Sequence, residues 1–286
     1  MKFKFADIVF NIISDEMLEV SDIIKPYEVG NDTLSDVDIH VTYKWDGKDH
    51  TSWKYVGKEV ASKYYYKDGI YCCETDGVPK PTSYSEFDKE LKNIKVVFNT
   101  EDYPNIGREA DNILKFAPMW YVFQKYNVIF LHASMVDYNG NGIVFTAKSG
   151  TGKSTQAGLW REYKNAVITN NDRVLLRKTD DKWYAYGYPI DGSDPVRTVR
   201  RTKVSAVVSL GQEKENRIEK LNVIKSIACI SSQTSMAQGY VIARENAINN
   251  AMKLCEDIPV YYLGCTPDDR AVELLYNTLK KDKVIN

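Results

Sequence analysis

Ala147-Lys148-Ser149-Gly150-Thr151-Gly152-Lys153-Ser154-Thr155 is the stretch that decides the class of this chain. It follows the phosphate-binding pattern GxxxxGK[ST] except that alanine replaces the first glycine. Two glycines, Gly150 and Gly152, let the backbone curl so that successive N–H groups point at a phosphate oxygen that no side chain blocks. An apolar run, residues 142–146, precedes the stretch and a helix-compatible run, residues 156–160, follows it. The sequence predicts strand, phosphate loop and helix in that order; the alternative is a plain glycine-rich turn.

Each residue type in the loop has an expected role toward a nucleoside triphosphate such as ATP. Lys153 reaches the β- and γ-phosphates, and Ser154 places its hydroxyl on Mg²⁺. A helix that begins at about Ser154 directs its positive end at the anion. The expected nucleotide-binding residues are Ser149, Gly150, Thr151, Gly152, Lys153, Ser154 and Thr155.

Composition excludes several classes of protein. The chain has 286 residues, of which 43% are hydrophobic, enough for a sizeable core. Because 38 basic residues nearly balance 39 acidic ones, no positive field favours nucleic acid or an acidic membrane surface. The five cysteines form no CxxC pair, and no apolar run is long enough to span a membrane. We therefore expect a cytoplasmic protein that binds neither nucleic acid nor membrane.

Two regions are expected along the chain. Residues 1–104 form a β-rich N-terminal region, and residues 105–286 form the catalytic domain with the phosphate loop. A helical stretch over 106–126, divided by Pro118, follows the first region. Alternation and β-branched or aromatic clusters predict strands in the first region at 2–10, 37–43, 52–56, 62–66, 69–73 and 94–98.

The strand that feeds the phosphate loop is expected to be the second arm of a hairpin. Asn139-Gly140 and Asn141-Gly142 are turn signals between the apolar runs 128–136 and 143–146. In common doubly wound nucleotide kinases the loop instead ends a parallel strand that is reached through a helical crossover. After the loop, a helix at 154–163 and a strand at 166–169 close a βαβ unit. Further helices are expected at about 224–230, 243–255 and 267–280.

Asp172 is the expected acidic group of the site. It follows the strand at 166–169, which places it at the edge of the sheet beside the phosphate loop. A carboxylate there can hold Mg²⁺ or take the proton from an attacking hydroxyl. The alternative is a turn residue that stabilises the backbone of residues 170–173.

His132 is the histidine with a chemical context. It lies on the first arm of the hairpin, where it can orient a phosphate or share a proton with Asp172. The alternative is a buried core histidine. His40 and His50, in the N-terminal region, show no comparable context.

The segment 188–201 combines turn residues, carboxylates and arginines. Asp191, or Asp194, is a candidate second ligand for the metal. Charge on the transferred phosphoryl group can be neutralised by Arg197, Arg200 or Arg201. The alternative is a solvated charged loop.

Together these residues resemble the HPr kinase/phosphorylase catalytic domain and its phosphoenolpyruvate carboxykinase-like fold. The resemblance covers about 128–275, and His132 in Leu-His-Ala-Ser-Met-Val matches the family's histidine. The family's Asp-Asp-Arg-Val run is matched by residues 171–174, which assigns the role of base to Asp172. Asn171 and Ala147 depart from the family pattern.

The resemblance implies an α/β (α+β) fold class, with a P-loop domain built on a mixed sheet after the β-rich N-terminal region. It implies a kinase that uses ATP and Mg²⁺ to phosphorylate a hydroxyl, either a serine of a peptide or protein or a small metabolite. Lys153, Asp172 and His132 are the expected catalytic residues, and Ser154, Asp172 and Asp191 the metal ligands. HPr kinases are hexamers, so a homo-oligomer is a further expectation. A nucleotide-binding module without turnover, which regulates a partner, is the alternative.

Overall fold

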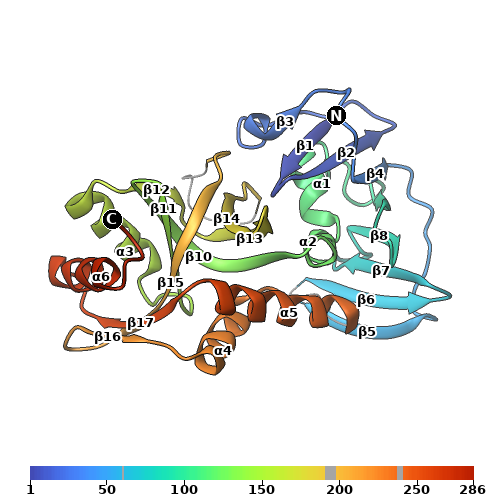
Figure 1. Ribbon diagram of the computed structural model, residues 1–286. Helices are drawn as coiled ribbons and strands as arrows, with labels where there is room; N and C mark the ends of the chain where they lie inside the picture. Colours follow the sequence, from blue (N-terminus) through green and yellow to red (C-terminus); the bar gives the residue numbers. More distant parts are fainter. Residues whose placement is uncertain (60, 191–197, 237–240) are drawn as a thin grey trace. The chain divides into compact units, whose positions relative to one another are not determined.

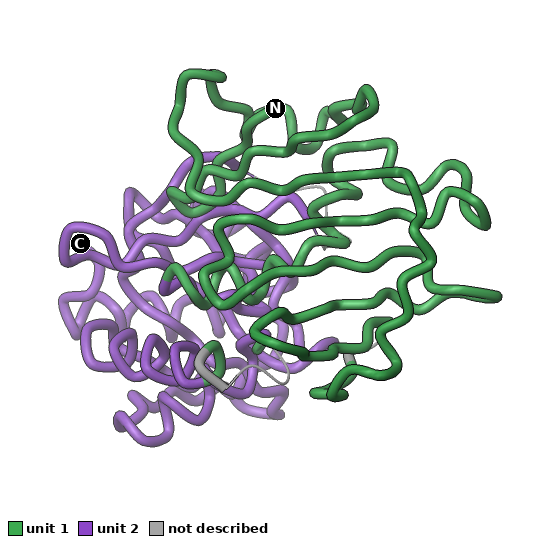
Figure 2. Tube along the Cα trace, turned by 90° about the vertical axis from the view of Figure 1, so that its right-hand side faces the viewer, with its two compact units in different colours: residues 1–126, 236–244 green, residues 127–235, 245–286 purple. Residues whose placement is uncertain are grey.

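The computed structural model describes residues 1–59, 61–190, 198–236 and 241–286 (Figure 1). It divides the chain into two compact units (Figure 2). The first unit comprises residues 1–126 and 236–244, and the second comprises residues 127–235 and 245–286. The domain boundary expected between residues 104 and 105 stays a prediction.

The first unit is built on a nine-stranded sheet with the order β3-β1-β2-β4-β9-β8-β7-β6-β5. Parallel pairing occurs between β2 and β4 and between β4 and β9, and the other neighbours are antiparallel. Its strands are β1 Lys2–Phe5, β2 Ile8–Ser14, β3 Glu28–Val29, β4 Val37–Thr42, β5 Lys54–Glu59, β6 Ser62–Lys67, β7 Ile70–Thr75, β8 Ser83–Asp88 and β9 Asn93–Phe98.

Two short helices, α1 Ala110–Phe116 and α2 Met119–Lys125, pack on this sheet through aromatic rings. Tyr121 of α2 meets Phe87 edge-on at 5.0 Å between ring centroids, and Phe116 of α1 meets Phe98 at 5.2 Å. Pro118 is the N-cap of α2, so the break expected at this proline is present. Its missing N–H and fixed φ suit the start of a helix better than its interior.

The second unit holds the predicted site. Its strands are β10 Val128–Tyr138, β11 Asn141–Thr146, β12 Val167–Asn170, β13 Arg173–Thr179, β14 Lys182–Gly187, β15 Thr202–Gln212, β16 Arg217–Lys220 and β17 Val260–Cys265. Its helices are α3 Lys153–Lys164, α4 Val223–Gln233, α6 Asp269–Lys281 and the greater part of α5 Val241–Asp257.

The sheet of the second unit is mixed. Its order is β11-β10-β13-β14-β15-β17-β16, and β12 also pairs with β10. The pairs β11–β15 and β15–β17 are parallel, whereas β10 is antiparallel to β11, β12 and β13. Because β11 also pairs with β15, strands β11, β10, β13, β14 and β15 form a closed circuit. Large mixed sheets with helices make this an α+β protein, in agreement with the broad fold class expected.

The hairpin that leads to the phosphate loop is present. β10 and β11 pair from Tyr138 opposite Asn141 to Ala133 opposite Thr146. The two turn residues, Asn139 and Gly140, have φ of 50° and 82°. Two successive positive φ angles belong to the type I′ turn that Asn-Gly favours, since its twist matches that of the strands.

Helices cover both faces of this sheet. Consecutive residues Val207 and Val208 of β15 belong to different core clusters, because neighbouring side chains on a strand point to opposite faces. One cluster contains Trp160 of α3 and Leu275 of α6, and the other contains Ile230 of α4. Figure 1 shows α3 close to α6 and α4 close to α5. This packing fixes the start of α3 at the end of β11.

None of the helices within the described ranges combines the length and the apolar character that crossing a membrane requires.

Candidate functional site

The expected phosphate loop connects β11 to α3 and has the backbone that its glycines suggested. Gly150 has a φ of +77°, and Gly152, the N-cap of α3, has a φ of +109°. A Cβ at either position would meet no atom within 4 Å. The backbone angles, not crowding, therefore favour glycine here. Ala147, which replaces the first glycine of the pattern, is buried in the core beside α3, where its methyl group packs.

Lys153 is the first residue of α3, and its side chain folds back under the loop. Its Nζ donates to the carbonyl oxygens of Ala147 at 3.1 Å and Lys148 at 3.4 Å. The residue is only 7% exposed. Burial lowers the pKa of Lys153, with the charge of Arg173 acting in the same direction and that of Asp172 opposing it. The ammonium of Lys153 thus donates to two backbone carbonyl oxygens of the loop, and an anion would bind it more strongly.

Residues 171–172 interrupt the sheet between β12 and β13, which both pair with β10. The backbone N–H of Ala133 still donates to the Asp172 carbonyl at 3.1 Å, so the interruption stays attached to β10. Asn170 closes the turn, because its Oδ1 accepts from the N–H groups of Asp172 and Arg173 at 3.1 Å each. The turn therefore uses the Asn170 side chain, and the carboxylate of Asp172 is left for other contacts.

His132 lies beside that carboxylate. Its Nε2 is 3.3 Å from Oδ1 of Asp172, and the two side chains are 23% and 29% exposed. His132 is thus not a fully buried core residue. Burial lowers the pKa of His132, and the charges of Lys153 and Arg173 lower it further, against the contrary effect of Asp172. The imidazole is therefore mainly neutral at pH 7, where it can donate to Asp172 through one nitrogen.

A cavity of about 340 Å³ brings these groups together. The loop, the start of α3 and the interruption after β12 all contribute to it. The Ser154 hydroxyl donates to the carbonyl oxygen of Asn171 at 3.4 Å, which joins the helix start to the interruption. The lining residues are His132, Ser149, Gly150, Gly152, Lys153, Ser154, Thr155, Asn171 and Asp172. Among the site residues expected at 132, 149–155 and 172, Thr151 is the one that does not line the cavity.

Two of the arginines expected to act on the phosphoryl group, Arg200 and Arg201, do not line this cavity. Arg200 lies 3.4 Å from Asp137, at the far end of β10 from His132. The guanidinium of Arg201 lies over the ring of Tyr184, 4.4 Å from its centroid. The remaining candidates of that segment, Asp191, Asp194 and Arg197, fall outside the described residues.

Sequence reasoning gave no role to two residues that the structure brings to the site. Asn170 holds the backbone of the interruption, and Arg173 is the Cα partner of His132 across β10 and β13. A signal existed for both, since they flank the expected catalytic residue Asp172. Their functions depend on the pairing with β10, which local sequence does not reveal.

Among the described residues, no group of three or more His, Cys, Asp or Glu side chains is arranged to hold a metal ion. This excludes a zinc-like site made by side chains alone in that part of the chain. Mg²⁺ differs, because it commonly takes one or two protein oxygens and completes its shell with phosphate oxygens and water.

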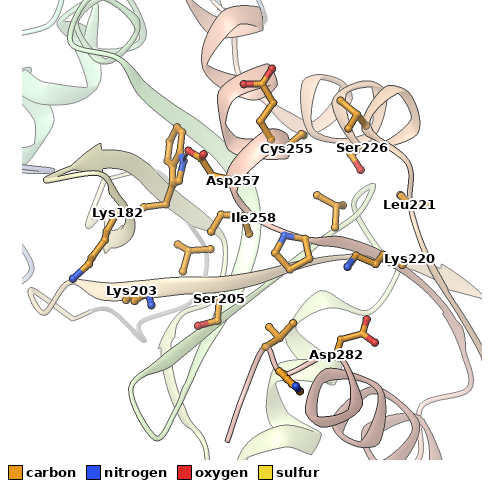
Figure 3. Close-up of a pocket in the computed structure, with 18 of the residues that line it drawn as sticks. Lys182, Lys203, Ser205, Lys220, Leu221, Ser226, Cys255, Asp257, Ile258 and Asp282 are labelled. Atoms are coloured by element: carbon orange, nitrogen blue, oxygen red, sulfur yellow. Dashed lines mark hydrogen bonds between the residues drawn. The ribbon is translucent and has the colours of Figure 1, made fainter.

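A larger cavity of the second unit lies elsewhere (Figure 3). Its volume is about 880 Å³, and it lies at the start of β15, whereas Gln212 at the end of β15 donates to the Gly150 carbonyl of the loop. Seven strand residues separate the two places, about 23 Å. Asp257 in this cavity already accepts a hydrogen bond from the Trp183 indole at 2.8 Å. Lys182, Lys203 and Lys220, which Figure 3 labels, also line this cavity. This cavity is separate from the candidate site.

Comparisons with known proteins give the following. Structural similarity is found to the Hpr(Ser) kinase/phosphatase from Coxiella burnetii, with 14% sequence identity and a TM-score of 0.33. That similarity covers 54% of this chain and 98% of the other, and no function is carried over at this level. No curated protein matches the sequence. A family model described as SynChlorMet cassette protein ScmC matches residues 111–274, more than half of the chain. The chain therefore belongs to the ScmC family.

Proposed function

We propose that this protein is an ATP- and Mg²⁺-dependent kinase that transfers the γ-phosphoryl group to a hydroxyl. The acceptor would be a serine of a peptide or protein, or a small hydroxylated metabolite. The second unit would then be a phosphoenolpyruvate carboxykinase-like P-loop domain, as the sequence resemblance implies. One observation carries the proposal: a carboxylate paired with a histidine faces the same cavity as a glycine loop with a buried lysine.

The chemistry of the loop fits a triphosphate. Gly150 and Gly152 leave open space above the backbone, and α3 begins there with its N–H groups free of helix partners. Lys153 supplies a positive charge in a buried position, where the attraction to phosphate is weakly screened.

Two oxygen ligands fit Mg²⁺. They are the hydroxyl of Ser154 and the carboxylate of Asp172, and both line the cavity. When bound, the metal would supply charge neutralisation on the phosphates. Asp191 remains the proposed further ligand, outside the described residues.

The residues divide the reaction between them. Asp172 accepts the proton of the acceptor hydroxyl while the acceptor oxygen forms its bond to the γ-phosphorus. The bond from that phosphorus to the bridging oxygen breaks, and the electron pair leaves with ADP. Lys153 stabilises the charge on the phosphates, and His132 orients the Asp172 carboxylate by a hydrogen bond to Oδ1.

The test separates binding from transfer. The substitution Asp172→Asn should leave the affinity for ADP, measured without Mg²⁺, within about twofold, while transfer to serine-bearing peptides or metabolites falls about 10²- to 10⁴-fold. Lys153→Met should instead weaken Mg·ADP binding itself. Calorimetry measures the affinity, and labelled ATP measures the transfer. Asp180→Asn, at an exposed turn residue, is the matched control.

Different results point to different failures. Binding of Mg·ATP without transfer to any acceptor by the native chain would favour a regulatory nucleotide-binding module. No binding of nucleotide at all would overturn the proposal.

A further inference from the structure

Arg173 occupies a defined place next to the catalytic pair. It begins β13 and is the Cα partner of His132 on β10, so the two side chains stand on the same face of the sheet. Its backbone N–H is held by Asn170, the residue that also holds Asp172. The position of Arg173 is therefore fixed by the same turn as the proposed base.

The guanidinium of Arg173 is held against the sheet but is not neutralised. Its central carbon lies 5.8 Å from the centroid of the buried Phe130 ring, two residues before His132 on β10. Within the described ranges, no carboxylate forms an ion pair with it. Arg217 and Arg270 of this unit, by contrast, bind Glu213 and Asp268 through two nitrogens each. A half-buried guanidinium without a carboxylate partner favours an anion from outside the chain.

Arg173 does not line the cavity itself, but it adjoins Asp172 in the chain and faces His132 across β10 and β13, and both of those residues do. Arg173 acts electrostatically on both His132 and Lys153, which line the cavity. Two cations are thus close to the pair of His132 and Asp172: Lys153 in the wall of the cavity, and Arg173 on the strand that pairs with His132. A phosphoryl group that moves from the loop toward an acceptor beside Asp172 would approach the second cation.

We propose that Arg173 is a catalytic residue that binds the phosphoryl group during its transfer, on the acceptor side of the site. This inference rests on the proposed kinase function. It assigns to Arg173 the role that sequence reasoning gave to the arginines of segment 197–201. The bonds that form and break are those of the transfer itself, and Arg173 exchanges no proton, because its guanidinium stays charged. The contribution comes from charge that grows on the phosphoryl oxygens in the transition state.

The experiment compares a ground-state ligand with a mimic of the transferring group. Calorimetry measures the binding of Mg·ADP alone and of Mg·ADP with aluminium fluoride. For Arg173→Met, the affinity for Mg·ADP should stay within about twofold, while the affinity for the fluoride complex should fall about 10²- to 10³-fold. Arg173→Lys should recover part of the loss, since it keeps the charge but not the planar fork. Arg161→Met, at an exposed position of α3, is the matched control.

Three results would count against this inference. Unchanged fluoride-complex binding by Arg173→Met would show that the guanidinium does not contact the group. Equal weakening of both ligands, with no recovery in Arg173→Lys, would assign Arg173 a structural role. Failure of the native chain to bind Mg·ADP would overturn the proposed function, and this inference with it. If Lys153→Met loses Mg·ADP binding while Arg173→Met keeps it, the proposed function stands. A loss of fluoride-complex binding in Arg173→Met is then due to Arg173.

Discussion

Gly152 shows how a single residue can be required by backbone angle alone. Its φ of +109° is rare for residues with a side chain, although a Cβ there would meet no atom within 4 Å. In the same helix, Gly158 also has open space around a Cβ but lies in the helix interior, without a positive φ. Because a side chain would be uncrowded at both positions, a difference between them reports the backbone strain at position 152.

We expect Gly152→Ala to destabilise the protein by about 1–2 kcal/mol, because an L-residue must adopt a left-handed angle. Mg·ADP affinity should fall as well, since relief of the strain moves the loop N–H groups. Gly158→Ala should instead stabilise by about 0.5–1 kcal/mol, through a better helix propensity. Urea unfolding and calorimetry measure both quantities. Equal effects of the two substitutions would contradict the proposed role of the loop backbone.

The catalytic pair was predictable at this scale only in part. Asp172 and His132 were named from their strand positions, and the structure brings them within 3.3 Å. Their catalytic roles stay predictions. Arg173 received no role from the sequence, because its proposed role depends on its pairing with His132. The two residues lie on different strands, and local sequence does not reveal that they pair.

The interruption between β12 and β13 is the element that shapes the site. One long strand, β10, pairs with both, so the chain leaves the ladder for residues 171–172 and then rejoins it. Asn170 is buried and closes this interruption with its side-chain oxygen. Regular pairing on both sides holds the partly buried carboxylate of Asp172 in place beside the loop.

We expect Asn170→Ala to reduce phosphate transfer more than nucleotide affinity. The substitution leaves the N–H groups of Asp172 and Arg173 without their acceptor, which costs about 1–3 kcal/mol if they stay unpaired. The interruption should then relax, while the loop and Lys153 keep their contacts. Transfer rate and Mg·ADP affinity, measured on the same preparation, check this. A parallel loss of both would show that the interruption also supports the loop. Asn139→Ala, in the distant hairpin turn, controls for general destabilisation.

Elements with local signals were predicted well, and others were not. The hairpin before the loop follows from Asn139-Gly140, whose turn type depends on two adjacent residues. Strand β8, Ser83–Asp88, was missed, because serine, glutamate and aspartate hide its alternation. It is a strand because it pairs with β7 and β9, and that pairing is not local. The break between β12 and β13 was expected at residues 170–173, but the pairing of both strands with β10 was not, because that pairing is not local.

At the scale of the molecule, the first unit contains a titratable centre that sequence reasoning passed over. His50 is fully buried, with Nε2 3.1 Å from Glu86 and Nδ1 3.7 Å from Glu74. Burial opposes its protonation, but the two carboxylates outweigh burial and raise the pKa of His50. Lys48 also bonds Glu86, so the cluster contains two cations and two carboxylates when His50 is protonated.

The stability of this unit should therefore depend on pH. A raised folded-state pKa means that the contribution of His50 is complete below its unfolded pKa of about 6.5 and is lost as pH rises through the folded value. Urea unfolding of the native chain and of His50→Gln should differ more at pH 6 than at pH 9. His40→Gln, at an exposed position, is the control. A difference that does not change with pH would contradict this account.

The composition of the whole chain indicated the class of protein but not how the chain divides into units. Balanced charge argued against nucleic acid, and hydrophobic content predicted a large core, which the two units contain. The division of α5, Val241–Asp257, between the two units after Arg244 could not be read from the sequence.

The regular ladder on either side of residues 171–172 has a practical consequence. A carboxylate that no ladder bond requires can be exchanged for an amide of the same shape while β10 keeps both of its partners. The Asp172→Asn chain should fold, bind nucleotide and hold the hydroxyl acceptor, which it can no longer phosphorylate. This inactive variant can be used to capture the natural acceptor from a mixture of compounds, and the captured compound can then be identified.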